Sequence, residues 1–170
     1  MKKFLVPALI LLSPTLHAQS LSERAAKDEL VFMQDEDPTM RRAFEVAKDT
    51  LDDFLKVSNA PSQSKTGFSL KVAISQGKNT EYFWVNDFVA KGSDQFEGEI
   101  GNEPRMVKTV KFGQRYVFSR AQIVDWLYVD KEQRRMMGNF TLCALLTKES
   151  REEAEATKRR YKLDCSQVTQ

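Results

Sequence analysis

Two groups of acidic side chains have the residue types and the spacing that general acid and base chemistry needs. Asp125 stands directly before Trp126, and a carboxyl group that an aromatic ring shields from water acquires the raised pKa of a general acid. Glu97 and Glu99 alternate with apolar and small residues. Both carboxylates therefore point to one face of a strand, an arrangement that suits glycoside hydrolysis or a hard metal ion.

Each group also has a structural interpretation, which we favour. In it, Asp125 accepts backbone donors at a turn while Trp126 fills the core, and the two glutamates belong to a solvated strand face. The sequence ties no third carboxylate to Glu97 and Glu99, and the glycines form no phosphate-binding pattern, so we predict neither a metal site nor a cofactor. Trp84 and Trp126 are the candidate binding residues.

Residues 62–67 contain two patterns of the penicillin-recognising serine enzymes, S-x-x-K and K-T-G. In those enzymes the two patterns lie far apart, one on a helix and the other on a strand. Here they share Lys65 in a linker, so we interpret the match as chance.

The first eighteen residues have the order of a secretory signal peptide. Lys2 and Lys3 precede an apolar run at residues 4–12, and a polar stretch ends at Ala18, which is the expected arrangement of a cleaved signal. The run is shorter than the roughly 20 residues that span a bilayer. We therefore predict cleavage after Ala18 and a periplasmic or secreted protein without a stable membrane anchor.

Cleavage at that point changes the chemistry left to the chain. It removes two lysines and His17, the single histidine, and leaves acidic and basic residues in equal number. A chain balanced in this way lacks the positive footprint of a nucleic-acid binder. The absence of histidine excludes Ser-His-Asp and Cys-His catalysis. Cys143 and Cys165 remain, and in an oxidising compartment we expect a disulfide between them rather than two free thiols.

The hydrophobic pattern predicts the elements that would position these residues. Asp37 and Pro38 begin an amphipathic helix of about 18 residues. Ser150 and Glu153 match the capping box of a polar C-terminal helix. Between the two helices, residues 119–126 start as a helical turn, and short strands are expected at residues 68–74, 81–89, 95–100, 107–111, 116–118 and 140–146. The expected fold is α+β, with one long helix packed on a strongly curved, mainly antiparallel sheet of five or six short strands.

The middle of the chain resembles a known family through motifs spread over residues 30–146. The motifs are Asp37-Pro38-x-Met40, Glu81-x-x-Trp84-Val85, Phe96-x-Gly98, Asn102-x-Pro104, Gly113 before a strand, Ile123-x-Asp125-Trp126 and Gly138-x-Phe140-Thr141. They are similar to those of the YegJ-like bacterial domains of unknown function (domain of unknown function 2314). The resemblance implies a fold and no reaction.

The resemblance also suggests boundaries along the chain. A signal peptide at residues 1–18 and an N-terminal arm at residues 19–36 precede a YegJ-like domain at residues 37–147. A charged helix and tail follow at residues 148–170. The cysteine pair and this charged helix depart from the family pattern and resemble elaborations for secretion.

These observations favour a non-enzymatic binding or interaction domain of the periplasm. Its expected partner is another envelope protein, and such partners include a toxin or envelope enzyme that it would inhibit as an immunity factor does. A weaker alternative is that the domain only scaffolds a larger envelope assembly. The alternative is a carboxylate-dependent enzyme that acts on a cell-wall or small polar substrate with Asp125, Glu97 or Glu99 as acid and base. Convergence of two of these carboxylates within roughly 5–10 Å in a pocket would favour the enzyme.

Overall fold

The computed structural model describes residues 37–60 and 63–169, so the predicted signal peptide and N-terminal arm lie outside the described residues. The described chain forms, in order, α2 (Pro38–Asp49), α3 (Leu51–Ser58), β1 (Lys65–Gln76), β2 (Asn79–Ala90), β3 (Gln95–Ile100), β4 (Arg115–Ser119), the short helix η1 (Arg120–Gln122), β5 (Ile123–Asp130), β6 (Arg135–Gly138), α4 (Phe140–Leu146) and α5 (Arg151–Tyr161). The predicted α+β class is confirmed.

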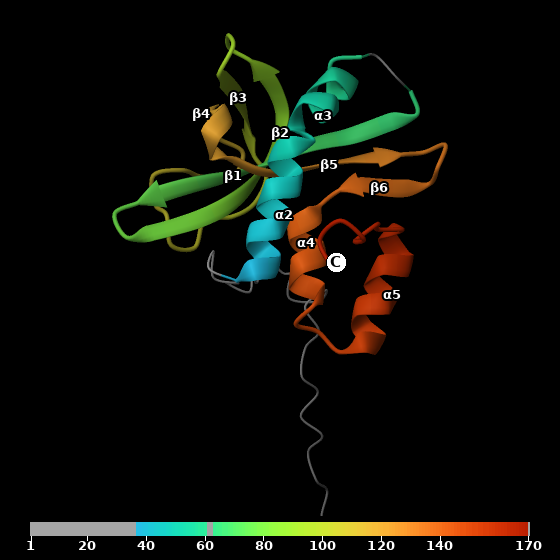
Figure 1. Cartoon of the computed structure of the whole chain (residues 1–170). Helices are drawn as coiled ribbons and strands as arrows, with labels where there is room; N and C mark the ends of the chain where they lie inside the picture. Colours follow the sequence, from blue (N-terminus) through green and yellow to red (C-terminus); the bar gives the residue numbers. More distant parts are fainter. Residues whose placement is uncertain (1–36, 61–62, 170) are drawn as a thin grey trace, which may run out of the picture.

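The six strands form one open antiparallel sheet in the order β4-β3-β2-β1-β5-β6 (Figure 1). The prediction of a mainly antiparallel sheet of five or six strands is therefore confirmed. The two central strands, β1 and β2, are 12 residues long each rather than short. Because β5 returns to pair with β1, residues of β5 lie beside those of β1 although about fifty positions separate them in sequence.

The single long helix expected after Asp37 is instead two helices that meet at Thr50. Asp37 caps α2 as predicted, since its carboxylate accepts the N–H of Thr39 at 2.8 Å. The Thr50 hydroxyl donates to the Val46 carbonyl at 2.6 Å, and hydroxyls that bond to the preceding turn bend or interrupt helices. The apolar stripe continues through both helices. Its buried residues are Met40, Ala43, Val46, Ala47, Leu51 and Phe54.

Residues 140–146, for which the sequence predicted a strand, form helix α4. Gly138 and Asn139 both have positive φ, 74° and 59°, and they turn the chain out of the short strand β6, which was not predicted. Six of these seven residues are apolar, and such a short apolar run fits a buried helix as well as a strand. The prediction was wrong because periodicity alone cannot separate the two.

The strand expected at residues 107–111 is also absent from the described chain. The backbone N–H groups of Met106 and Val107 donate to the Glu81 carboxylate, both at 3.0 Å. The N–H of Lys108 donates to the Gln76 amide oxygen at 2.7 Å. These donors bond to side chains, so they are not available to a neighbouring strand.

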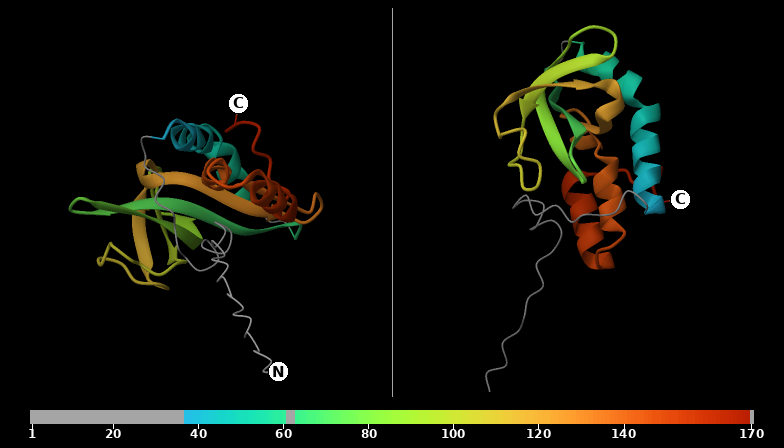
Figure 2. Two further views of the ribbon diagram at one scale, coloured as in Figure 1. Left: turned by 90° about the horizontal axis from the view of Figure 1, so that it is seen from below. Right: turned by 90° about the vertical axis from the view of Figure 1, so that its left-hand side faces the viewer.

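The helices and the C-terminal tail cover the sheet and complete the core. Figure 2 shows α2 and α4 on the same side of the long strands, and α2 packs against both α4 and β5. The predicted cap of α5 is present, with the Ser150 hydroxyl accepting the N–H of Glu153 at 3.2 Å. After α5, Cys165 forms the predicted disulfide with Cys143 of α4. The disulfide holds the C-terminal tail, residues 162–169, against α4.

Candidate functional site

Asp125 lies in a buried cluster with Lys71, Thr141 and Trp84. Asp125 of β5 and Trp84 of β2 are both register partners of Lys71 on β1, and directly paired residues share one face of a sheet. The Lys71 ammonium donates to the Thr141 hydroxyl at 2.8 Å and lies 5.1 Å from the centre of the Trp84 ring. Asp125 is fully buried and Lys71 is 6% exposed. Asp125, Lys71 and Thr141 are therefore shielded from solvent, whereas Trp84 is half-buried.

The Asp125 carboxylate takes the place of a helix cap for α4. It accepts the N–H of Trp126 at 2.8 Å, the N–H of Phe140 at 3.2 Å, and both the N–H and the hydroxyl of Thr141, at 2.7 and 2.6 Å. Asn139, which precedes the helix, makes no capping bond with its own side chain. The carboxylate thus satisfies donors that a helix start otherwise leaves without partners.

Burial shifts both charges of the cluster towards neutrality. It raises the pKa of Asp125, against the opposing effects of Lys71 and the Thr141 donors, and it lowers the pKa of Lys71. A raised carboxyl pKa is what the sequence suggested for a general acid. Both oxygens of Asp125, however, already accept two hydrogen bonds each, which fits the structural interpretation.

Glu97 and Glu99 lie on β3, away from Asp125. The Glu97 carboxylate is 2.8 Å from the Lys91 ammonium and 3.8 Å from the Arg115 guanidinium. Its pKa is lowered, chiefly by the hydrogen bond with Lys91. Because β2 and β1 separate β3 from β5, the glutamates are three strand spacings, roughly 14 Å along the sheet, from Asp125. The structure does not bring the three carboxylates together.

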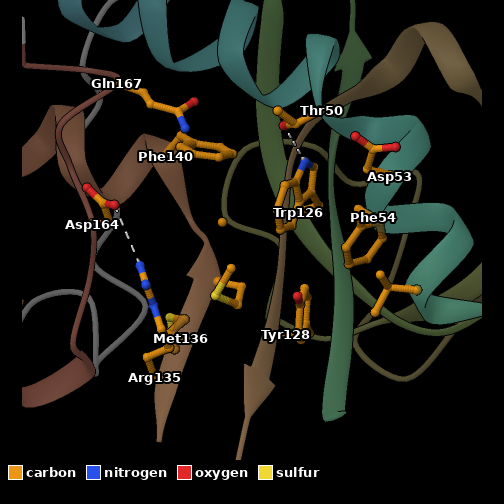
Figure 3. Close-up of a pocket in the computed structure, with 13 residues that line it drawn as sticks. Thr50, Asp53, Phe54, Trp126, Tyr128, Arg135, Met136, Phe140, Asp164 and Gln167 are labelled. Carbon is orange, nitrogen blue, oxygen red and sulfur yellow. Dashed lines mark hydrogen bonds and ion pairs between the residues drawn. The ribbon is translucent and has the colours of Figure 1, made fainter. Parts of the chain in front are cut away.

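A pocket lies beside Trp126 (Figure 3). Its volume is about 280 Å³. The lining residues come from the helices α3 and α4, the strands β5 and β6, and the tail. They are Thr50, Asp53, Phe54, Val57, Trp126, Tyr128, Arg135, Met136, Met137, Gly138, Phe140, Asp164 and Gln167.

Aromatic rings form a fixed wall of this pocket. The Trp126 ring stacks on Phe54 with 4.9 Å between centroids and meets Phe140 edge-on at 5.3 Å. Its indole N–H donates to the Ala47 carbonyl at 3.1 Å and to the Thr50 hydroxyl at 3.2 Å. Paired rings with a satisfied polar group are held in one orientation. The wall is therefore in place before any ligand arrives.

Arg135 and Asp164 form the charged rim of the pocket. Figure 3 shows Arg135 reaching from β6 towards Asp164 of the tail, and 3.7 Å separates the Arg135 terminal nitrogen from the carboxylate oxygen. The Nε atom of Arg135 is buried, and no hydrogen-bond acceptor in the described chain reaches it. A buried donor without an acceptor costs about 1–3 kcal/mol. The rim therefore contains a cation that is incompletely satisfied.

Sequence reasoning singled out part of this site and missed the rest. Trp126 lines the pocket, whereas Trp84 lies over Lys71 in the buried cluster. The sequence analysis singled out neither Lys71, which alternates with apolar residues, nor Arg135, which follows another arginine. Neither residue has a sequence pattern that reveals its neighbours, since these come from β5, α4 and the tail.

Metal binding and membrane insertion are two further roles that the described residues could have. Within residues 37–60 and 63–169, no group of three or more histidine, cysteine or acidic side chains is arranged to hold a metal ion. In the same residues, no helix has the length and apolar character needed to cross a bilayer.

Comparisons with known proteins place the chain among its relatives. A family model described as "Uncharacterized protein conserved in bacteria (DUF2314)" matches residues 37–165, which include the whole sheet, the buried cluster and most of the pocket. The chain is also 30% identical over 155 residues to "Uncharacterized protein YegJ" of Escherichia coli (strain K12), covering 91% of this chain and 95% of that protein. No solved structure gives a significant match. The resemblance seen in the sequence motifs is confirmed, and the chain belongs to the DUF2314 family of bacterial proteins.

Proposed function

We propose that the chain is an exported, non-enzymatic binding domain of the bacterial envelope, and that its binding site is the Trp126 pocket. The basic and apolar order of the first eighteen residues supports export. The Cys143–Cys165 disulfide also supports it, because such bonds persist mainly in oxidising compartments.

The pocket itself is the observation that carries the binding function. Its aromatic wall and the Met136 and Met137 side chains offer apolar surface, and only a few polar groups stand at its edge. Preformed concave surfaces of this composition are typical of ligand sites. Methionine side chains adapt to ligands of different outline, so the β6 side of the pocket can adjust while the Trp126 side stays fixed.

The placement of the acidic residues supports binding rather than catalysis. Asp125 is not a lining residue, and its oxygens are occupied by backbone and Thr141 donors. Of the two carboxylates at the pocket, Asp53 pairs with Lys56 at 2.8 Å, and Asp164 accepts the Ser166 hydroxyl at 2.7 Å. General acid and base catalysis needs groups that reach the reacting atoms, and the candidates named from sequence do not meet in this pocket.

Titration with indole, a neutral aromatic probe, tests the proposal by nuclear magnetic resonance of the disulfide-bonded protein. We expect saturable shifts of the Trp126 indole signal and of the Met136 and Met137 methyl signals. Trp84→Phe leaves a single indole resonance and so assigns the Trp126 signal. Absence of saturable shifts at the pocket, or shifts confined to other surfaces, would contradict the proposal.

A matched pair of substitutions separates pocket binding from general attraction to apolar surface. Val57→Trp places a large ring in the pocket lining on α3, whereas Val117→Trp adds the same ring at an exposed position on β4. We expect the first substitution to abolish the indole shifts and the second to leave them unchanged. Equal indole shifts in the Val57→Trp and Val117→Trp variants would also contradict binding at the pocket.

A further inference from the structure

We infer that the Trp126 pocket takes a small monocarboxylic acid with an aromatic or branched apolar body, and that Arg135 binds its carboxylate. The inference rests on the proposed function, because it assumes that the pocket binds a ligand. It adds the chemical class of that ligand and the residue that selects it.

Arg135 is the group at the pocket whose bonding is least complete. A guanidinium has five N–H donors in a planar fork that matches a carboxylate with two parallel bonds. Among the described residues, its charged partner is Asp164 at 3.7 Å, which is too long for a hydrogen bond. Its Nε has no acceptor at all within the same part of the chain. The Arg135 side chain as a whole is 29% exposed, so an incoming carboxylate can reach its terminal nitrogens and supply the acceptors that Asp164 is too distant to provide.

The two acidic side chains at the pocket do not cancel this preference. Asp53 is held by Lys56 on the same helix. One oxygen of Asp164 accepts both the N–H and the hydroxyl of Ser166, at 3.1 and 2.7 Å, and these bonds fix the carboxylate to the tail. Each carboxylate therefore has a short-range partner, whereas the charged partner of Arg135 within the described chain, Asp164, lies 3.7 Å away.

The rest of the pocket sets the shape of the ligand. The cavity of about 280 Å³ is at the small end of ligand pockets, which span roughly 300–1,000 Å³. Trp126 and Phe54 lie across the pocket from Arg135 and Asp164, and Phe140 lies above Asp164 beside Gln167 (Figure 3). A ligand with one apolar group and one carboxylate can contact the wall and Arg135 at the same time.

Three probes of equal outline and different charge test the inference. They are 3-phenylpropionate, its neutral amide 3-phenylpropionamide, and the cation 3-phenylpropylamine, each titrated into the disulfide-bonded protein by calorimetry and nuclear magnetic resonance. We expect the acid to bind about tenfold more tightly than the amide, the size expected for one charge-assisted contact. The amine should bind most weakly.

Substitutions at the rim identify the residue responsible. Arg135→Gln should weaken binding of the acid about tenfold and leave the amide unchanged, and Arg135→Lys should restore part of the difference because it keeps the charge without the fork. Asp164→Asn should strengthen binding of the acid, since it removes the competing carboxylate. Arg115→Gln on β4 is the matched control, because Arg115 also faces a carboxylate, that of Glu97, at 3.8 Å. This substitution should leave the affinities for the acid and the amide unchanged.

The outcomes separate this inference from the proposed function. Binding of acid and amide with equal affinity, with shifts at the pocket, would overturn the inference and leave the binding site in place. A preference for the amine would also overturn it. If a short peptide ending in phenylalanine binds more tightly than 3-phenylpropionate, the ligand is the C-terminus of a protein chain and not a small molecule, which would overturn this part of the inference. Failure of all probes to shift the pocket signals would instead overturn the proposed function.

Discussion

Asp125 joins three parts of the chain through one buried carboxylate. It lies on β5, it is paired in register with Lys71 on β1, and it accepts the first N–H groups of α4. Removing such a group leaves a buried ammonium without its counter-charge and buried N–H groups without acceptors, and both losses are costly. The structural role assigned to Asp125 therefore has a measurable consequence.

We predict that Asp125→Asn lowers the free energy of unfolding by about 3–5 kcal/mol, the range for breaking a buried charged pair. The amide keeps the size of the side chain but presents N–H donors to N–H donors. Urea unfolding followed by circular dichroism measures the change. Glu97→Gln makes the same chemical replacement in an exposed ion pair and should barely move the midpoint. An unchanged midpoint for Asp125→Asn together with lost ligand binding would show a functional role instead.

Gly138 provides a second prediction for a single residue. Gly138 and Gly113 both have φ of 74°, so alanine at either position carries the same backbone strain of about 1–2 kcal/mol. Open space surrounds Gly113, whereas a methyl group on Gly138 would collide with the carbonyl oxygen and ring of Trp126. We expect Gly138→Ala to cost about 2 kcal/mol more than Gly113→Ala, measured by urea unfolding. Equal losses would mean that the β6 turn relaxes without cost.

What the sequence reveals at this scale is the identity of a few unusual residues, not their surroundings. The Asp125-Trp126 pair was recognised as a carboxylate beside an aromatic ring. In the structure the pair lies within β5 and not at a turn, Asp125 accepts backbone donors at the start of α4, and the Trp126 ring is buried. Lys71 was not recognised, because an alternating pattern assigns every second residue to solvent. Its burial depends on α4, because its ammonium group contacts Thr141, which lies 70 residues later in the sequence.

At the scale of elements, the errors share one cause. Strands were expected at residues 140–146, which are strongly apolar, and at residues 107–111, which contain Val107 and Val110. In the structure, the first segment is a helix capped by Asp125. The second is a loop whose backbone N–H groups donate to the side chains of Glu81 and Gln76. In each case a side chain distant in sequence accepts the backbone donors. Local patterns cannot contain that information. The strands at residues 68–74 and 81–89 and the cap of α2 depend on neighbouring residues, and they were predicted correctly.

The cap of α2 also connects two elements and makes stability depend on pH. The Asp37 carboxylate is 2.7 Å from the Lys148 ammonium just after α4, and the hydrogen bond with Lys148 is the main reason that the pKa of Asp37 is lowered. A carboxyl group with a lower pKa in the folded state stabilises the fold above its unfolded pKa. The contribution is lost as the pH falls through the folded pKa.

We therefore predict that Asp37→Asn, which keeps a capping oxygen but removes the charge, lowers the melting temperature at about pH 6 and not at about pH 2. Thermal unfolding across this pH range measures the gap, which is the difference in melting temperature between the variant and the unsubstituted protein. Lys148→Gln should reproduce the same pH-dependent gap, because it removes the other half of the pair. A gap that stays constant with pH would show that the ion pair contributes nothing and that only the cap differs.

For the molecule as a whole, the disulfide determines whether the pocket is complete. Cys143 lies in α4 among the core residues, and Cys165 is in the tail that also carries Asp164 and Gln167 to the pocket. Helix α5 buries only Ala154 and Thr157, so its own packing holds the tail weakly. The covalent bond therefore fixes one wall of the pocket, and the proposed export to an oxidising compartment would favour its formation.

We predict that Cys143→Ala combined with Cys165→Ala lowers the free energy of unfolding by about 3 kcal/mol, the chain-entropy value for a loop of this length. We also expect weaker binding of indole and of 3-phenylpropionate, because the tail can leave the pocket. Urea unfolding and calorimetric titration measure the two effects. A reducing agent should lower the free energy of unfolding and the probe affinity of the unsubstituted protein to the same extent, and it should leave both quantities unchanged in the double variant. If the double variant is destabilised but binds both probes as before, the tail is not part of the binding site, and Asp164 cannot compete with a ligand for Arg135.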